Sequence, residues 1–267
     1  MYKDPYNNCR FANDESMSSW SDIGQKNSVS FNNEIWRIIG VFDIKKNANS
    51  AAEKRIKLIR GSVFTKEHDY KDSFNGIWDD FFMKRYLNDY LGSGLTDDDN
   101  GKKYSLNAES QNLIDDASWY IGSPDNRNSN YTASQFYNYE HNMVWYGKVG
   151  LMSVSDYGFA SMSCKNGSKT VYQYNNCPNW LRRFGREFTM IRSGRYNQGC
   201  NGSYNCTHIV SNIFIIDCNS NYSSDRGKIA EGDVFYKNYY QPVVYLKSDV
   251  IITGGDGSYS NPYTLSL

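Results

Sequence analysis

Six cysteines are the residues of this chain whose type and spacing most clearly imply chemistry. Two pairs bracket polar loops rich in Gly, Ser and Asn, one pair 13 residues apart and the other six. An even number of cysteines in such positions favours disulfides, which restrict the unfolded chain where a loop has little core of its own. We therefore predict up to three disulfides, which pair Cys164 with Cys177, Cys200 with Cys206, and Cys9 with Cys218. Disulfides indicate an oxidising, extracytoplasmic setting.

Free buried thiols and a metal site are the two alternatives for these cysteines. A zinc site needs closely paired ligands, such as two cysteines separated by two residues, with a second pair or histidine partners. The spacings of 13 and six do not fit, and His208 is the only histidine near the later cysteines. His68 and His141 are remote, and no two histidines lie four residues apart, as a zinc-protease helix requires. We expect no metal and no cofactor.

Other catalytic patterns give no positive support to an enzyme. The sequence has no GxSxG motif, no P-loop and no GxGxxG after a strand. The acids of residues 96–103 (TDDDNGKK) suggest calcium only faintly, because the glutamate that closes a calcium loop is out of register; a solvated linker is favoured. The acid pairs at 79–80 and 115–116 consist of neighbours, which face different directions on a helix. We expect a protein that is not an enzyme.

The composition is that of a globular chain that can also expose aromatic rings. Hydrophobic residues make up 39% and charged residues 22%, which excludes a disordered chain. The 23 tyrosines can lie half in a core and half in water. Basic and acidic residues number 29 each, so the basic excess typical of nucleic-acid binding is missing. No apolar run of about 18 residues occurs, so we expect no membrane span, and the polar N-terminus is not a signal peptide.

The first half of the chain predicts strands followed by helices. Residues 32–44 are rich in β-branched and aromatic residues and predict a strand, and the alternating residues 55–64 predict its hairpin partner. Apolar residues at three-to-four spacing predict a helix within 76–95. A second helix is expected over 107–122 and a short third one over 132–140.

The second half predicts strands separated by polar loops. Residues 145–163 predict a strand followed by a turn, and further strands are expected within 186–194, 212–218, 227–235, 241–249 and 251–267. Early strands without a neighbouring partner pair with late ones, so we predict an α+β fold with mixed or antiparallel sheets and two main helices between early and late strands. We expect an N-terminal extension over 1–30 and a single domain over 31–267.

Several segments in combination resemble one protein family. They are NNEIWRIIGVFD, KRIKLIR, GLTDDD, DASWYIG, TASQFYNYE, GKVGLMSVSDYGFA and QPVVYLKSDVIITGGDGSYSNPYTL. Together they resemble an uncharacterised family of surface proteins from gut Firmicutes and related bacteria, over most of the chain from about Asn32. That family is similar to C-type-lectin-like folds, a group that includes formylglycine-generating enzymes and the variable proteins of diversity-generating retroelements. The resemblance implies an extracellular or cell-surface location.

The two branches of that fold imply different functions. The enzyme branch uses a reactive cysteine pair in its C-terminal part, and Cys200 and Cys206 do not lie in a matching motif, so the resemblance does not extend to that activity. In the retroelement branch, ligand-binding residues lie in the C-terminal strands and loops. Adenine-directed mutation of Asn-type codons diversifies them and favours Asn, Tyr, Ser and Asp. Residues 195–240 have that composition.

This composition also favours binding on physical grounds. Tyrosine gives a large, rigid contact area, and Ser, Gly and Asn add adaptable hydrogen bonds, as in antibody loops. We predict non-catalytic recognition of a protein or glycan at a bacterial or phage surface, by shape-complementary contact. The candidate contact residues are Arg195, Tyr196, Asn197, Tyr204, Asn205, His208, Asn219, Asn221, Tyr222, Arg226, Tyr236, Asn238, Tyr239 and Tyr240. A structural surface module without a specific ligand and an enzyme of the formylglycine-generating branch are the alternatives.

Overall fold

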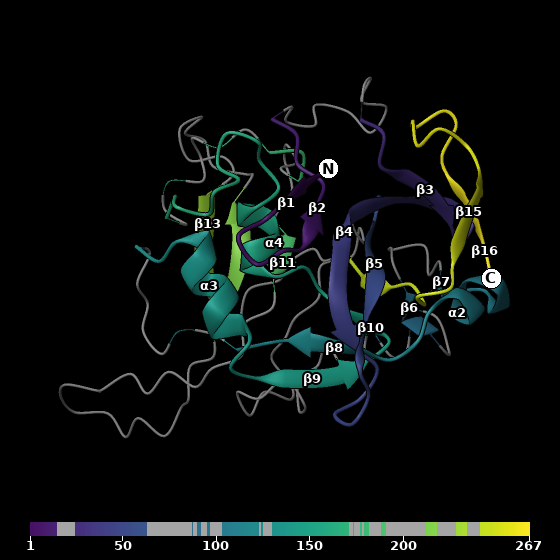
Figure 1. The fold of residues 1–267 in the computed structure, drawn as a ribbon, viewed down its shortest axis with the longest axis horizontal. Coiled ribbons are helices and arrows are strands. Elements are labelled where there is room, and N and C mark those ends of the chain that lie inside the picture. The colour runs from purple at the N-terminus through teal and green to yellow at the C-terminus, as the bar shows by residue number, and fades with distance from the viewer. Residues whose placement is uncertain are drawn as a thin grey trace.

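The computed structural model describes part of the chain. The described residues are 1–14, 25–62, 87, 90–91, 95–96, 103–122, 124, 130–170, 173, 177, 179–181, 188–190, 212–217, 228–233 and 241–267. Over these residues the fold is a mixed α+β arrangement with mostly antiparallel strands and few helices (Figure 1). The expected α+β class is therefore confirmed.

The largest sheet joins strands from both halves of the chain. In spatial order its strands are β1 (Tyr2–Lys3), β2 (Cys9–Arg10), β4 (Glu34–Lys45), β5 (Ala52–Arg60), β14 (Val243–Tyr245) and β10 (Val149–Gly150), and β3 (Ser28–Phe31) pairs with β4. Each of these pairings is antiparallel. Because β14 lies between β5 and β10, the expected pairing of early with late strands is confirmed.

Described residues of the segment 1–30 form β1, β2 and most of β3 in this sheet. Arg10 lies beside Gly40 of β4, and the amide of Phe11 donates to the carbonyl of Ile39 at 2.8 Å. This attachment depends on backbone hydrogen bonds of a polar stretch, so hydrophobic alternation does not reveal it. The expected extension over 1–30 and single domain over 31–267 stay predictions.

The hairpin of β4 and β5 carries much of the core. Trp36 and Leu58 are completely buried, and the Trp36 ring meets that of Phe31 edge-on with centroids 5.0 Å apart. Burial of a large apolar side chain contributes about 1.5–3 kcal/mol, so residues such as these fix the register of the hairpin. The strands expected at 32–44 and 55–64 are confirmed, with ends that differ by a few residues.

The helix expected over 107–122 is wrong in its extent. Helix α2 covers Ala108–Leu113, and Asn107 caps it by accepting a hydrogen bond from the Ser110 amide. The chain then becomes extended, and β8 (Ala117–Tyr120) pairs with β9 (Val144–Gly147). Aromatic cross-strand pairs such as Trp119 beside Trp145 favour the strand, and this tertiary pairing overrides the helical pattern.

Two further helices follow, one expected and one not. The short helix expected over 132–140 is confirmed as α3 (Ala133–Glu140), which begins with a capping box. Residues 145–163 do not form only a strand and a turn, because α4 (Val154–Gly158) follows β10. Ser153 and Asp156 cap α4 reciprocally, which stabilises a helix too short to show a hydrophobic period. Of the helix expected within 76–95, Leu87, Tyr90, Leu91 and Leu95 are described; the first three are helical, and Leu95 begins β6.

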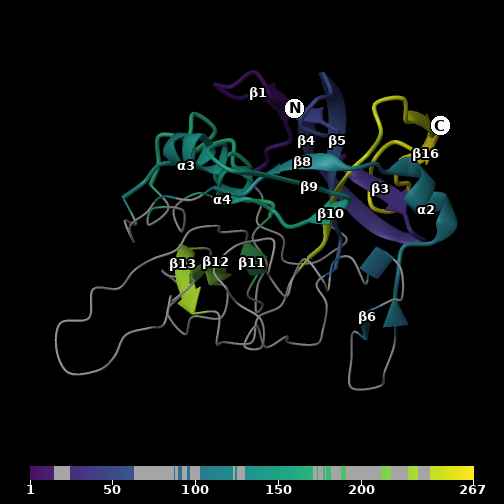
Figure 2. The same ribbon diagram turned by 90° about the horizontal axis from the view of Figure 1, so that it is seen from below.

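Smaller sheets complete the described fold. They are β11 (Phe188–Met190), β12 (Asn212–Asp217) and β13 (Lys228–Asp233) in one sheet, β15 (Ile251–Gly254) with β16 (Thr264–Ser266), and β6 (Leu95–Thr96) with β7 (Lys103–Tyr104). The views agree that β11–β13 form a separate layer on one side of α3, α4 and β10 (Figure 2). The β15–β16 hairpin lies against β3, where Val29 bridges to Tyr263.

Candidate functional site

The fourteen candidate contact residues all lie outside the described part of the chain. They are Arg195, Tyr196, Asn197, Tyr204, Asn205, His208, Asn219, Asn221, Tyr222, Arg226, Tyr236, Asn238, Tyr239 and Tyr240. The strands that flank these segments are described, and their register shows where each segment is attached.

One end of the β11–β13 sheet carries three of these attachment points. Both pairings are antiparallel, with Met190 beside Phe214 and Asn212 beside Asp233. The end of β11, the start of β12 and the end of β13 therefore lie at the same end of the sheet. Ten of the fourteen candidates belong to the two segments attached there, and the four between Asn219 and Arg226 belong to the segment attached at the opposite end.

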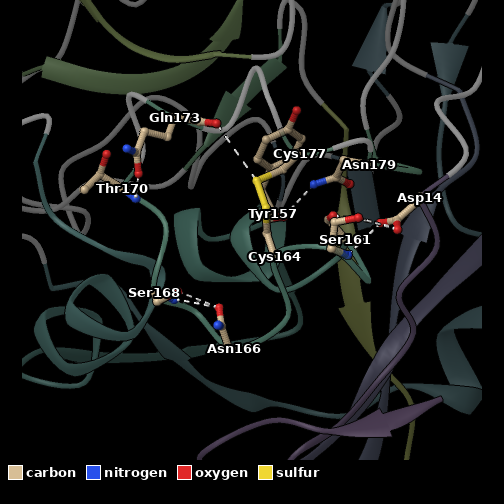
Figure 3. Close-up of a disulfide and its surroundings, with 11 residues drawn as sticks. Asp14, Tyr157, Ser161, Cys164, Asn166, Ser168, Thr170, Gln173, Cys177 and Asn179 are labelled. Atoms are coloured by element: carbon tan, nitrogen blue, oxygen red, sulfur yellow. Dashed lines mark hydrogen bonds between the residues drawn. A yellow bond between two sulfur atoms is a disulfide. The ribbon is translucent and has the colours of Figure 1, made fainter.

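One predicted disulfide is confirmed. Cys164 and Cys177 are bonded, with Cα atoms 6.0 Å apart, and both are buried. Figure 3 shows the disulfide beside α4, where Asn179 donates to the carbonyl of Tyr157 at 2.7 Å. Asp14 accepts a hydrogen bond from the hydroxyl of Ser161 at 2.9 Å (Figure 3). The disulfide and these hydrogen bonds hold the segment after α4 against the helix and the N-terminal segment.

The other cysteines do not add a second confirmed pair. Cys9 has a free thiol, so the expected bond between Cys9 and Cys218 is not formed. Cys9 lies within β2, between Lys3 of β1 and Val41 of β4, and its pairing with Cys218 follows from elimination alone. Cys200, Cys206 and Cys218 lie outside the described residues.

The described residues instead contain a group of buried charges centred on Asp156 of α4. Its carboxylate accepts hydrogen bonds from Arg10 Nη1 at 2.9 Å and from Lys57 Nζ. Arg10 in turn donates from Nε to Asp4 at 2.5 Å. All four side chains are almost completely removed from solvent. We call Asp4, Arg10, Lys57, Asp156 and the adjacent Glu140 the buried charge cluster.

The cluster joins four parts of the chain. Arg10 comes from β2, Lys57 from β5, Asp156 from the first turn of α4 and Glu140 from the last turn of α3. Glu140 Oε1 accepts from the amide of Ser155 at 2.9 Å, and Oε2 accepts from its hydroxyl at 2.5 Å. Both carboxylates thus lie at the N-terminus of α4, where unsatisfied amides favour negative charge.

Aromatic rings surround both cations of the cluster. The Lys57 ammonium lies 5.3 Å from the centroid of the Tyr245 ring, 5.4 Å from that of Phe42 and 5.7 Å from that of Trp119. Arg10 also lies over the Phe42 ring, 4.8 Å from its centroid. These cation–π contacts offset part of the cost of removing two cations from water.

A cavity of about 40 Å³ lies beside the cluster. One water needs roughly 10–15 Å³ by this measure, so the cavity has room for about three. Its polar lining includes Lys57, Glu140 and Asp156, and its aromatic lining includes Trp119 and Tyr245. Half-buried Tyr120 and Tyr137 and exposed His141 also line it, so the cavity reaches the surface between β8 and α3.

Burial and charge shift the two carboxyls of the cavity in opposite directions. Burial raises the pKa of Glu140 to about 7, although the hydrogen bonds from Ser155 act the other way. Asp156 is equally buried, but the charges of Lys57 and Arg10 outweigh its desolvation and lower its pKa to about 2. At neutral pH, Asp156 is therefore a fixed anion, whereas Glu140 exists in both protonation states.

The two carboxylates of the cavity differ in their chemical properties. Asp156 is held by two cations and by the Ser153 amide, and with so low a pKa it is a poor base. Glu140 has a pKa suited to proton transfer, and the hydroxyl of Ser155 donates a hydrogen bond to it. Among the described residues, no group of three or more His, Cys, Asp or Glu could hold a metal ion.

Sequence reasoning does not identify this site. Arg10 and Asp156 are 146 residues apart, and only the sheet topology brings them together. Lys57 alternates with apolar residues, a pattern typical of a solvent-facing side chain, although it is 5% exposed. The S-x-x-D of the α4 capping box, Ser153 to Asp156, is the one local signal that could place a carboxylate at a helix N-terminus.

No helix within the described ranges has the length and apolar character needed to cross a membrane. Comparison with protein-family models, with curated proteins and with solved structures finds no match.

Proposed function

We propose that the protein recognises a protein or glycan ligand at a bacterial or phage surface without changing it chemically. The fold that we propose is C-type-lectin-like, and the contact surface is the Tyr/Asn/Ser-rich part of residues 195–240. Within this proposal the described α+β scaffold positions the contact segments, and the Cys164–Cys177 disulfide stabilises the scaffold outside the cell.

The register of β11–β13 is the observation that carries this proposal. Met190, Asn212 and Asp233, the residues from which the segments 191–211 and 234–240 continue, lie at one end of a single sheet. Segments attached at one end of a sheet can form one contact surface, and they lose less conformational entropy on binding than segments spread over a protein. The ten candidates on these segments are therefore the stronger set, and the four between 219 and 226 are the weaker one.

The test replaces Tyr239 and Tyr240 by Ala. An array of glycans and of bacterial surface proteins is probed with the wild-type protein, with Tyr239→Ala/Tyr240→Ala and with Tyr259→Ala, a control at an exposed tyrosine near the β15–β16 hairpin. We expect the double variant to lose at least about tenfold in affinity, since tyrosines buried in an interface are often binding hot spots, and the control to bind like the wild type. Equal binding by all three proteins would refute the contact surface.

The coding DNA tests the proposed diversification separately. Adenine-directed mutation leaves Asn, Tyr and Ser codons in 195–240 that derive from AAY, beside a near-identical template repeat and a reverse-transcriptase gene. If the codons match those of the rest of the gene and no repeat exists, diversification is wrong, and the binding surface remains to be judged by the array.

A further inference from the structure

The cavity beside the buried charge cluster has hydrogen-bonding capacity that the described residues do not use. Tyr245 is 3% exposed and lines the cavity, and its hydroxyl forms no hydrogen bond with the part of the chain that the structure describes. The Lys57 ammonium can donate three hydrogen bonds and donates one to a described residue, Asp156. Lys57 and Tyr245 both line the cavity, so both can hydrogen-bond with an occupant.

The charges around the cavity favour a neutral occupant. Asp4, Arg10, Asp156 and Lys57 form successive ion pairs, so their four charges cancel. Glu140 adds either no charge or one negative charge at neutral pH. An ionic ligand would bring an unmatched charge into a site whose own charges are already paired, and the desolvation of that charge is expensive.

The donors and acceptors favour hydroxyl groups. Lys57 and Tyr245 offer N–H and O–H donors, whereas Glu140 offers carboxylate lone pairs beyond the two hydrogen bonds from Ser155. A hydroxyl group donates one hydrogen bond and accepts two, so adjacent hydroxyls can satisfy both sides. The volume of about 40 Å³ admits two such groups and excludes a whole sugar ring.

The mouth of the cavity carries stacked aromatic rings. Tyr120 and His141 are stacked with centroids 3.7 Å apart, and Tyr137 lies 4.1 Å from His141 and 3.8 Å from Tyr6. Tyr120 and Tyr137 are half-buried, so each still has exposed surface. Because Tyr137 and His141 each have a neighbouring ring on both faces, Tyr120, at the end of the stack, is the ring whose outer face can meet the C–H groups of a ligand.

We propose that this cavity binds the edge of a neutral sugar, which inserts two adjacent hydroxyls towards Lys57, Tyr245 and Glu140 and rests its ring on the aromatic mouth. The site uses no metal ion. None of the residues that line the cavity belongs to 195–240, so this proposal and the proposed contact surface can be tested independently.

Isothermal titration calorimetry with the methyl glycosides of glucose, galactose and mannose tests the site. We expect saturable binding of at least one of them, unchanged by EDTA, and weaker binding of glucuronate and glucosamine, which carry a charge. The absence of saturable binding by all three glycosides, or tighter binding of a charged sugar, would overturn the proposal. Loss of binding with EDTA would overturn the metal-free mode.

Tyr245→Phe is the decisive variant because it removes only the hydroxyl. That hydroxyl has no partner among the described residues, so thermal stability should not fall, whereas affinity for the glycoside should fall about tenfold. Tyr90→Phe is the control: Tyr90 is also buried, but its hydroxyl contacts Glu34 at 3.3 Å and does not line the cavity. Unchanged affinity in Tyr245→Phe, or an equal loss in both variants, would contradict the site.

Two further measurements keep the interpretation specific. Tyr239→Ala/Tyr240→Ala should bind the glycoside like the wild type, and a matching loss there would assign binding to the other surface. The intact mass should show no loss of water from the chain. A mass lower by one water would mean that the Lys57 amine and the Asp156 carboxyl had condensed to an amide, which leaves no ammonium to donate and overturns the proposal.

Discussion

Replacing Glu140 by glutamine should stabilise the protein above neutral pH and leave its stability nearly unchanged in acid. Glu140 is buried, and its carboxyl keeps its hydrogen bonds from Ser155 only at the cost of desolvation when it is ionised. The glutamine side chain has nearly the same shape and an amide oxygen that can still accept from the Ser155 amide, but it carries no charge. The Glu140→Gln variant therefore isolates the cost of the charge.

The magnitude follows from the raised pKa. In the unfolded chain the Glu140 carboxyl has a pKa near 4.5, and in the folded protein its pKa is about 7. Below about pH 4.5 both states are protonated, and the folded protein has its full stability. As the pH rises from there through about 7, the unfolded state gains its favourable charge first, so stability is lost, by about 3 kcal/mol at 1.36 kcal/mol per pKa unit. The Glu140→Gln variant does not undergo this loss.

Urea unfolding followed by tryptophan fluorescence, from about pH 4 to about pH 9, measures the effect. The difference in unfolding free energy between Glu140→Gln and the wild type should grow from near zero in acid to about 3 kcal/mol at high pH. Comparing the two proteins cancels the other groups that face Glu140, namely Arg10, Lys57, His141 and Asp156. Glu109→Gln, at an exposed position in the first turn of α2, serves as the matched control and should show no such trend.

A flat difference between Glu140→Gln and the wild type would refute the reasoning. It would mean that water or a rearrangement solvates the ionised carboxyl, so that burial does not raise its pKa. A difference that grows towards acid would mean that the folded protein prefers the ionised form, as a strong interaction with Lys57 would produce. Either result would also mean that Glu140 is ionised at neutral pH and gives the cavity one negative charge.

Three further predictions concern the scaffold. Asp156→Asn should cost about 3–5 kcal/mol in urea unfolding, because it leaves two buried cations without their shared anion; Asp43→Asn, in an exposed pair with Lys54, should cost less than about 1 kcal/mol. Cys164→Ser should cost about 3 kcal/mol, and reducing agent should lower the stability of the wild type but not of the variant. Gly255→Ala should speed amide hydrogen exchange in the β15–β16 hairpin, since Gly255 has φ of +80° and an added Cβ would lie 2.0 Å from the Pro262 carbonyl oxygen.

Each of these predictions has an outcome that contradicts it. Equal losses in Asp156→Asn and Asp43→Asn would mean that the cluster is solvated. Equal sensitivity of wild type and Cys164→Ser to reducing agent would assign the effect to another cysteine. Unchanged exchange in Gly255→Ala would mean that the turn accommodates a side chain by moving.

The parts of the fold that the sequence predicts correctly have strong local patterns. The hairpin of β4 and β5 has long alternating strands, and β14 combines β-branched residues with a flanking proline. Both can therefore be recognised from their local sequence alone. The segment 117–120 is wrongly predicted as helix because its apolar residues continue the spacing of α2. Its pairing with 144–147 depends on a partner more than 20 residues away, which no local pattern contains.

The buried charge cluster could not be predicted because its members look like surface residues. Lys57 and Arg10 lie in short or alternating stretches where a charged residue is usually solvated. Their burial depends on an anion from α4, a helix of five residues whose only local signal is its capping box. The fourteen contact candidates differ from the cluster in that the composition of the sequence suggests them, whereas the structure describes only the strands that flank them.

The position of β14 between β5 and β10 has a consequence for biosynthesis. The ribosome makes β5 and β10 before β14, and neither can pair with β14 until the chain through Tyr245 has emerged. In a nascent chain the edge of β5 therefore stays open for most of synthesis and that of β10 from the time it is made, and the largest sheet closes late, through contacts of long sequence separation.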